Sequence, residues 1–568
     1  MNLPALIAVA QGQQPADLLL ANVQLLNVLS GEIYPAHIAV FEGVIAGLEE
    51  LPAKQVIDAR GAFAAPGLID GHVHLESSLL TPAQFARAVV PHGTTTVVAD
   101  PHEIANVLGL AGLDYMLTAS EHLPLDIFLM LPSCVPATHL ESSGAVLTAA
   151  DLQPYLKHPR ILGLAEMMNY PGVLSGDPQV LAKLAMAREK IIDGHAPLLS
   201  GSPLSAYCAA GISSDHECSH AAEALEKLRR GMFIMVREGS AARNLRDLLP
   251  LVTPYNANHC GFVTDDRHPD MLLNDGHIDA IVRQAIKLGL DPVTAIKMAT
   301  INTARHFGLR RRGALAPGYQ ADIVLFDDFE RLHVLKVFKR GRLVAENGKM
   351  VVEIPAASVQ VTNSVNFAPF DVSALRLEAR SERVRMIEIV PGQIITKNTL
   401  TEAPQRDGLI VSDPARDLLK LIVVERHHAT GRIGKGLVKG LGLQRGALAS
   451  TVAHDSHNII AAGVTDEDLY QAVQLLKEIG GGQVVVVDGK PLAQLALPVA
   501  GLLSDRSLEE VHRQCEQLQH AARQLGCQLP DPFMTLAFLA LPVIPELKLT
   551  DLGLIDVLQF KPVGVGVE

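Results

Sequence analysis

Short apolar runs alternate with amphipathic segments through the middle of the chain. Apolar runs typical of buried strands occupy residues 94–99, 127–131, 161–165 and 233–236. Apolar residues at helical spacing predict helices at residues 82–90, 180–192, 221–230 and 277–288. Strands that alternate with helices indicate repeated βα units around a parallel sheet. The section from 66 to 310 has close to the roughly 250 residues of a (β/α)8 barrel, so we expect a TIM-like barrel there.

Two strand-rich blocks flank the predicted barrel. Residues 17–48 and 321–344 carry short apolar runs separated by turn residues, which is typical of β-hairpins. Because the two blocks bracket the barrel in sequence, the simplest packing joins residues 1–65 and 311–360 into one small composite β-sandwich.

A third region follows the second block. Apolar spacing predicts helices at 466–479 and 508–525, and an apolar run predicts a buried strand at 484–487. The predicted fold class is therefore α/β, with a (β/α)8 TIM-like barrel at 66–310, a small composite β-sandwich domain and an additional C-terminal α/β domain at 361–568. An open doubly wound sheet is the alternative to the barrel, but no G-x-G-x-x-G motif follows an early strand.

The composition excludes several classes of protein. With 568 residues, of which 48% are hydrophobic, the chain can bury a large core, which excludes a mainly disordered protein. The formal net charge of −13 argues against a nucleic-acid partner, because phosphate binding needs a basic face. No uncharged stretch is apolar over the about 20 residues that a membrane-spanning helix needs, so we expect no membrane partner.

The cysteines indicate the cellular compartment. The chain has six, and none of them belongs to a C-x-x-C pair, which fits a reducing environment better than a disulfide scaffold. We therefore expect a cytoplasmic protein. Because proteins of this size commonly assemble symmetrically, we also expect a homo-oligomer, a dimer or higher.

The strongest chemical signal lies in the segment 66–76, whose sequence is PGLIDGHVHLE. An apolar strand ends there in His72-Val73-His74, and both imidazoles point to one side because strand side chains alternate. Neutral imidazoles bind zinc, iron or manganese. Taken alone, such a pair is more often two hydrogen-bonded polar histidines than a metal site, so the metal hypothesis needs further ligands.

Further metal-ligand side chains stand where later strands end. Glu166 follows the apolar run 161–165, and three more candidates follow at intervals of about one or two βα units. Catalytic residues of a barrel lie at the carboxyl ends of its strands, so we expect all six side chains to converge on one face. The six candidate metal ligands are His72, His74, Glu166, His195, His216 and Asp265.

Four imidazoles and two carboxylates exceed the needs of one catalytic ion. Two divalent ions about 3.5 to 4 Å apart, bridged by a carboxylate, would use the whole set. Such a pair makes hydroxide available near pH 7, which predicts hydrolytic attack on an electrophilic carbon. Asp265 is the candidate general base, since a carboxylate there can take the proton from the attacking water and pass it to the leaving atom.

The order of these ligands resembles the amidohydrolase superfamily. Within it, the chain resembles the bacterial adenine deaminase family over nearly its full length, including the extra C-terminal domain. The motifs behind this resemblance are PGLIDGHVHLESS at 66–78, DPHEIANVLG at 100–109, EMMNYPGV at 166–173, TDDRHPD at 264–270 and HDSHNI at 454–459.

The resemblance implies a specific reaction. Free adenine would be hydrolysed to hypoxanthine and ammonia, as in purine salvage, by attack of a metal-bound hydroxide at C6. It further implies two divalent metal ions, manganese as the first choice with iron or zinc as alternatives, and a C-terminal domain that covers the barrel mouth.

Two alternative functions follow from the same residues. Many hydrolases of this superfamily bridge their metals with a carboxylated lysine, whereas the resemblance places Glu166 at that position. That difference argues against an amidohydrolase that opens a cyclic amide or imide. A barrel without catalysis that serves as a scaffold is the second alternative, and the complete ligand set argues against it.

Several neighbouring residues have open roles. Glu217 is either a proton carrier for the purine ring or a hydrogen-bond acceptor that orients His216. Polar residues near the site fit pocket lining, contact with the metal ligands or simple loop structure. These further candidates are Glu76, Asp100, His102, His454 and His457.

Overall fold

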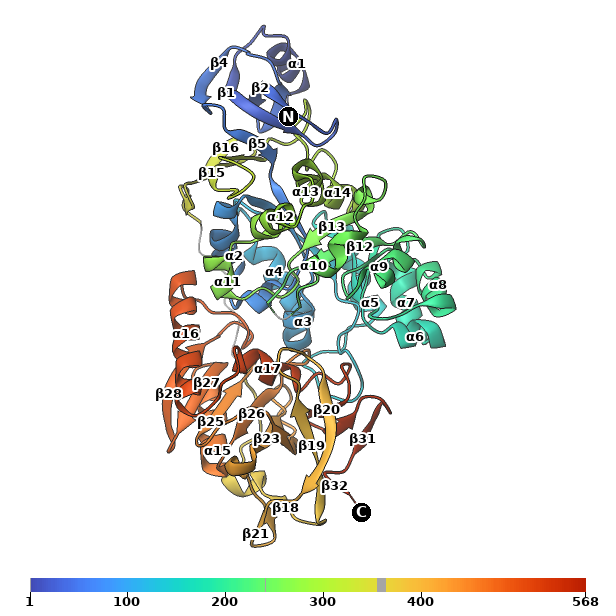
Figure 1. The fold of residues 1–568 in the computed structure, drawn as a ribbon, viewed down its shortest axis with the longest axis vertical. Coiled ribbons are helices and arrows are strands. Elements are labelled where there is room, and N and C mark those ends of the chain that lie inside the picture. The colour runs from blue at the N-terminus through green and yellow to red at the C-terminus, as the bar shows by residue number, and fades with distance from the viewer. Residues whose placement is uncertain (1, 241, 355–363, 568) are drawn as a thin grey trace.

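The computed structural model describes residues 2–240, 242–354 and 364–567. Three bodies follow one another along the long axis of the molecule: a β-sheet around the N-terminus, a central α/β body and a C-terminal body (Figure 1). Together they match the expected α/β fold class of a barrel with two additions.

The first body is a nine-stranded sheet built from both ends of the predicted barrel. Its N-terminal strands are β1 (Ala16–Asn27), β2 (Glu32–Phe41), β3 (Val44–Gly47), β4 (Ala53–Asp58) and β5 (Phe63–Pro66). Its later strands are β14 (Ile323–Phe326), β15 (Val334–Lys339), β16 (Arg342–Glu346) and β17 (Lys349–Met350). The two groups meet where β5 pairs antiparallel with β14, and we propose that they form one composite domain. Helix α1 (Leu3–Ala10) packs beside this sheet.

The central body contains eight parallel strands in two sheets. The strands are β6 (Leu68–Val73), β7 (Thr94–Ala99), β8 (Asp126–Leu131), β9 (Ile161–Met167), β10 (Ile191–Gly194), β11 (Ser214–Asp215), β12 (Phe233–Arg237) and β13 (Cys260–Val263). The first five and the last three are hydrogen-bonded in order. The backbone amides of Ser213 and Asp265 donate to the carbonyls of Ile192 and His72, which joins the edges of the two sheets and closes the barrel.

Helices follow most barrel strands. They are α2 (Pro82–Val89), α3 (His102–Leu108), α4 (Leu110–Ala119), α5 (Ala149–Leu152), α6 (Tyr170–Ser175), α7 (Pro178–Met186), α8 (Gly201–Ala209), α9 (Ala221–Leu228), α10 (Leu245–Leu248), α11 (Pro269–Asn274), α12 (Ile278–Lys287), α13 (Pro292–Met298) and α14 (Ile301–His306). One expectation was wrong: the helix predicted at 180–192 ends at Met186, and Ile191 and Ile192 begin β10. A short apolar run fits a helix or a buried strand, and here pairing with β9 decides for the strand.

The C-terminal body is built on a second nine-stranded sheet. Its strands are β19 (Arg383–Ile389), β20 (Thr396–Glu402), β23 (Leu418–Val424), β24 (Ile433–Lys439), β25 (Ala447–Ser450), β26 (Ile459–Gly463), β27 (Gly482–Val487), β28 (Lys490–Ala496) and β32 (Gly566–Val567). Its helices are α15 (Asp466–Glu478), α16 (Leu508–Gln524) and α17 (Pro532–Phe538), and a small sheet joins β29 (Leu547–Thr550), β30 (Gly553–Asp556) and β31 (Lys561–Val563). The expected domain boundary at 360/361 lies outside the described residues.

The C-terminal body contacts the loops at the carboxyl ends of the barrel strands. The carboxylate of Asp551 accepts hydrogen bonds from the backbone amide and the hydroxyl of Ser142, at 2.9 and 2.7 Å. Leu80 and Ser504 form an isolated β-bridge, and apolar side chains of both bodies share one buried cluster. The C-terminal body therefore packs against loops on the barrel face that carries the candidate ligands, and we propose that it covers this face. Within the described part of the chain, every helix is too short or too polar to cross a membrane.

A buried charge cluster joins the barrel to the composite sheet. Asp126 of β8 lies 2.7 Å from Lys339 Nζ and 3.0 Å from Arg340 Nη2, and it also pairs with Arg312. Burial raises the pKa of the Asp126 carboxyl, but Lys339 and Arg312 outweigh burial and hold that pKa well below its usual range. The carboxylate is therefore ionised in the folded protein.

Asp126→Asn should lower the free energy of unfolding by about 2 kcal/mol, because Lys339 and Arg312 lose one of two carboxylate partners and keep only Asp322. Thermal unfolding followed by circular dichroism measures the change. Asp407→Asn, at an exposed carboxylate, is the matched control. Equal melting temperatures for the two variants would contradict the structural role of Asp126.

Candidate active site

The six candidate ligands lie at the carboxyl ends of five barrel strands. His72 is in β6 and His74 follows it, Glu166 is in β9, and His195, His216 and Asp265 stand just after β10, β11 and β13. Parallel strands in a closed barrel end on one face, so these positions bring together residues that are far apart in sequence.

Glu166 occupies the centre of this group, and its two carboxylate oxygens face different partners. Oε1 lies 3.2 Å from Nε2 of His74. Oε2 lies 2.6 Å from Nδ1 of His195 and 3.1 Å from Nε2 of His216. The side chain is buried, with only 3% of its surface exposed. One carboxylate therefore connects two sets of imidazoles, which is the arrangement of a bridging ligand.

The set on the Oε1 side is completed by His72 and Asp265. Oδ1 of Asp265 lies 3.4 Å from Nε2 of His72 and 3.1 Å from Nε2 of His74. The two Nε2 atoms are 3.2 Å apart. Nδ1 of His74 lies 3.2 Å from the carbonyl oxygen of Asp100, an acceptor that places the ring proton on Nδ1 and leaves a lone pair on Nε2. Lone pairs and carboxylate oxygens that converge in a buried space fit a divalent cation.

The electrostatics of the site favour positive charge. Burial lowers the pKa of His74, but Asp265 and Glu166 outweigh it and hold that pKa well above its usual range. Burial raises the pKa of Glu166, yet His195 and His216 keep it well below its usual range. Burial also raises the pKa of Asp265, which the guanidinium of Arg237 outweighs in the same way. Both carboxylates are therefore ionised, as metal ligands must be.

Arg237, the last residue of β12, contacts two carboxylates of the candidate site, which its sequence pattern did not predict. Its Nη1 lies 2.7 Å from Oδ2 of Asp265, the carboxylate oxygen that faces away from the histidines. The same nitrogen contacts Oε1 of Glu217, and Nη2 lies 3.2 Å from Oε2 of Glu217. The available signal was its place at the end of an apolar run, the position that the ligands share.

Glu217 is thus held by a guanidinium fork. Burial raises its pKa, but Arg237 and His195 outweigh burial and lower that pKa below its usual range. Oε1 of Glu217 also lies 3.5 Å from Nε2 of His216. That nitrogen is the one that faces Glu166, so Glu217 lies on the side of the ring where the other candidate ligands converge, and both roles left open by the sequence stay predictions.

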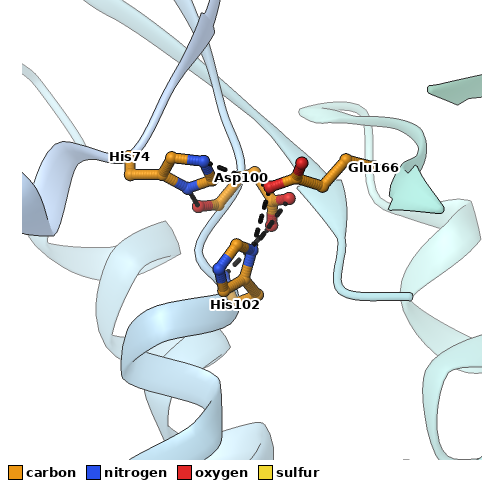
Figure 2. Close-up of side chains that lie close together, drawn as sticks. All are labelled: His74, Asp100, His102 and Glu166. Carbon is orange, nitrogen blue, oxygen red and sulfur yellow. Dashed lines mark hydrogen bonds and ion pairs between the residues drawn. The ribbon is translucent and has the colours of Figure 1, made fainter. Parts of the chain in front are cut away.

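Asp100 and His102 lie beside the carboxylate of Glu166, as Figure 2 shows. Nδ1 of His102 lies 3.1 Å from Oδ2 of Asp100 and 3.5 Å from Oε1 of Glu166. Both side chains are buried, and with His74 and Glu166 they form a group that could hold an ion. Their roles stay predictions, but their place beside the bridge fits contact with the site.

Residues of the C-terminal body reach this region through Glu103, the neighbour of His102. Nδ1 of His454 lies 2.7 Å from Oε1 of Glu103, and Nε2 of His457 contacts the other oxygen. Glu76 lies on the barrel side, where its Oε1 accepts a hydrogen bond from the amide of Ile104. Burial, together with the charge of Glu103, raises the pKa of Glu76 to about 7. The candidates named from the sequence therefore gather in one buried region.

Comparison of this chain with known proteins identifies its family. Residues 63–344 match the amidohydrolase family, and residues 393–561 match the adenine deaminase C-terminal domain. A protein of Carboxydothermus hydrogenoformans named adenine deaminase 2 is 53% identical over 99% of this chain and 99% of its own length. The chain belongs to the adenine deaminase family.

Other adenine deaminases align over similar lengths. The one from Dehalococcoides mccartyi is 52% identical over 99% of this chain and 98% of its own, and the one from Methanothrix thermoacetophila is 50% identical over the whole of both. Among solved structures, a β-aspartyl dipeptidase from Fervidobacterium islandicum is 18% identical, with a TM-score of 0.46 over 59% of this chain and 99% of that chain. The two family models lie on either side of residues 355–363.

Alanine at Glu166 or His195 should remove bound metal while the chain stays folded, because each residue faces the centre of the ligand set. Metal per chain measured by mass spectrometry after loading with manganese, with circular dichroism for folding, tests this. Glu189→Ala and His333→Ala, at exposed positions, are the matched controls. A Glu166 or His195 variant that keeps the metal content of the unchanged protein would remove that residue from the ligand set.

Metal binding should release protons at pH 7. Burial lowers the pKa of His195, but Glu217 and Glu166 outweigh burial and raise that pKa to about 9, so the metal-free ring is protonated at pH 7. A metal ligand must be neutral, so manganese displaces this proton, and the release should fade as the pH rises past about 9. Titration calorimetry in two buffers of different ionisation enthalpy measures it. Equal heats in the two buffers at pH 7 would contradict this assignment.

Proposed function

We propose that this protein catalyses the hydrolysis of adenine to hypoxanthine and ammonia at a centre of two divalent metal ions. The names of its full-length relatives support the reaction. The observation that carries the metal centre is Glu166, whose two oxygens face different sets of histidines. Manganese is the proposed metal, with iron or zinc as alternatives, because imidazole and carboxylate ligands suit all three.

The side chains divide into two ligand sets that share Glu166. His72, His74 and Asp265 would hold one ion together with Oε1, and His195 and His216 would hold the other with Oε2. Divalent ions at these positions would act as Lewis acids. They would lower the pKa of water, so that it loses a proton near neutral pH and becomes a nucleophile for carbon.

Asp265 is the proposed general base. It takes a proton from the attacking water while the C6–O bond forms, and it passes a proton to the exocyclic nitrogen before the C6–N bond breaks. The water oxygen remains on C6 of hypoxanthine, the second water proton ends on ring nitrogen N1, and the exocyclic nitrogen leaves as ammonia. Arg237 contacts the second oxygen of Asp265, which keeps the carboxylate ionised and aims its other oxygen at the histidines.

Glu217 is proposed to position the site. Its pairing with Arg237 favours a carboxylate that stays ionised, close to His195 and His216. Its negative charge would stabilise positive charge at this side of the site, and the ionised carboxylate can accept a proton or a hydrogen bond there.

The bridging glutamate and the named relatives both favour this reaction over the opening of a cyclic amide. A cytoplasmic location, a role in purine salvage and assembly into a homo-oligomer belong to the same proposal.

Purified protein supplied with manganese should release ammonia from adenine with an equal amount of hypoxanthine. An ammonia assay coupled to chromatography of the purine measures both products. If a protein that holds two manganese ions per chain released no ammonia from adenine, adenine would be excluded as the substrate while the metal centre would stand.

Arg237→Met should lower kcat by about 100-fold, because Asp265 and Glu217 lose the cation that orients them, whereas bound metal should remain. Arg237→Lys keeps the charge and should recover part of the loss. Steady-state kinetics with metal analysis measures both, and Arg246→Met at an exposed position is the control. Unchanged turnover in Arg237→Met would contradict the role of this residue.

A further inference from the structure

The loop between β25 and β26 brings residues of the C-terminal body into contact with the region of the candidate active site. It is anchored on the barrel by Glu103, which His454 contacts at 2.7 Å and His457 contacts through Nε2. Nδ1 of His457 accepts a hydrogen bond from the amide of Ala453, so its proton lies on Nε2 and is donated to Glu103. Two histidines of one loop therefore hold a single carboxylate of the barrel.

A buried arginine, Arg426, also binds the backbone of this loop. Arg426 is fully buried, and its guanidinium donates to the backbone carbonyls of His457 and Ala500. Nδ2 of Asn458 donates to the carbonyl of Ser142 at 2.7 Å, which ties the end of the loop to the barrel. The backbone of the loop is therefore fixed from both sides.

Asp455 stands in the middle of this fixed loop with one carboxylate oxygen unused. Only 3% of its surface is exposed, and Oδ2 has no hydrogen-bond partner among the residues that the structure describes. A buried carboxylate oxygen without a partner costs free energy, so a loop built to hold one there indicates a partner that arrives from outside.

The position of Asp455 indicates that this partner is the substrate. A carboxylate oxygen of Asp455 lies within 4.8 Å of ligand atoms of His102 and Glu103. His102 in turn lies 3.5 Å from Oε1 of Glu166. The side chain of His102 therefore lies between Asp455 and Glu166. This spacing suits a purine whose C6 lies beside Glu166 and whose five-membered ring lies beside Asp455.

The chemistry of a free purine base fits a carboxylate at that edge. Its five-membered ring carries an N–H, which a nucleoside lacks because the sugar replaces the proton at N9. Burial raises the pKa of Asp455 to about 6, so the carboxylate is ionised at pH 7 and accepts hydrogen bonds.

We propose that Asp455 of the C-terminal domain accepts a hydrogen bond from the five-membered-ring N–H of the purine substrate, and so selects the free base over N9-substituted purines. This inference rests on the proposed function. It gives the C-terminal domain a direct part in substrate choice.

The test compares adenine with 9-methyladenine, which has no proton at N9. In Asp455→Ala and Asp455→Asn, kcat/KM for adenine should fall by about 10- to 100-fold, since a hydrogen bond to a charged group is lost or weakened. The value for 9-methyladenine should not fall with it, so the preference for adenine shrinks. Dissociation constants for purine and 9-methylpurine, measured by calorimetry, should change in the same way without any need for turnover.

Asp551→Asn is the matched control, because Asp551 is another buried carboxylate that joins the C-terminal body to the barrel. The preference for adenine should be unchanged in that variant, and metal content and melting temperature are measured in all of them. Equal losses for both purines, an unchanged preference, or loss of a metal ion in Asp455→Asn would overturn the inference. A protein that binds purine through Asp455 but releases no ammonia from adenine would overturn the proposed function alone.

Discussion

The arrangement of the site depends on the contacts between the buried carboxylate of Glu166 and the histidines around it. A carboxylate with 3% exposure is costly unless positive charge compensates it, and here histidines approach it from two sides. The barrel makes this possible, because strands far apart in sequence end on one face and present their side chains inward. The pKa shifts of Glu166 and His74 express the same condition: the site holds its carboxylates ionised and gathers positive charge around them.

The C-terminal domain completes the electrostatic environment. The carboxylate of Glu103 lies 3.5 Å from Nε2 of His102 and is also contacted by two histidines of the loop at 454–457. Because these contacts are buried, the barrel face and its cover depend on each other. The same fixed loop holds Oδ2 of Asp455 in a buried position where none of the described residues gives it a hydrogen bond.

Local sequence patterns predicted the features that depend on neighbouring residues in the sequence, such as the ends of the barrel strands. Strand ends followed by polar side chains located the six candidate ligands, because the end of an apolar run is where a barrel strand meets its catalytic face. The helix predicted at 180–192 was wrong at its C-terminal end, because the last apolar residues of this segment fit a helix and a strand equally well. Pairing with the neighbouring strand β9 decides between the two. Arg237 and the pairing of Glu103 with His454 were missed because they depend on contacts between residues up to 351 positions apart, which no spacing encodes.

Anomalous diffraction from crystals of the manganese-loaded protein can locate the metal ions relative to Glu166. We expect two manganese peaks about 3.5 to 4 Å apart, one beside each oxygen of Glu166. A single peak, or two peaks that do not share Glu166, would contradict this expectation.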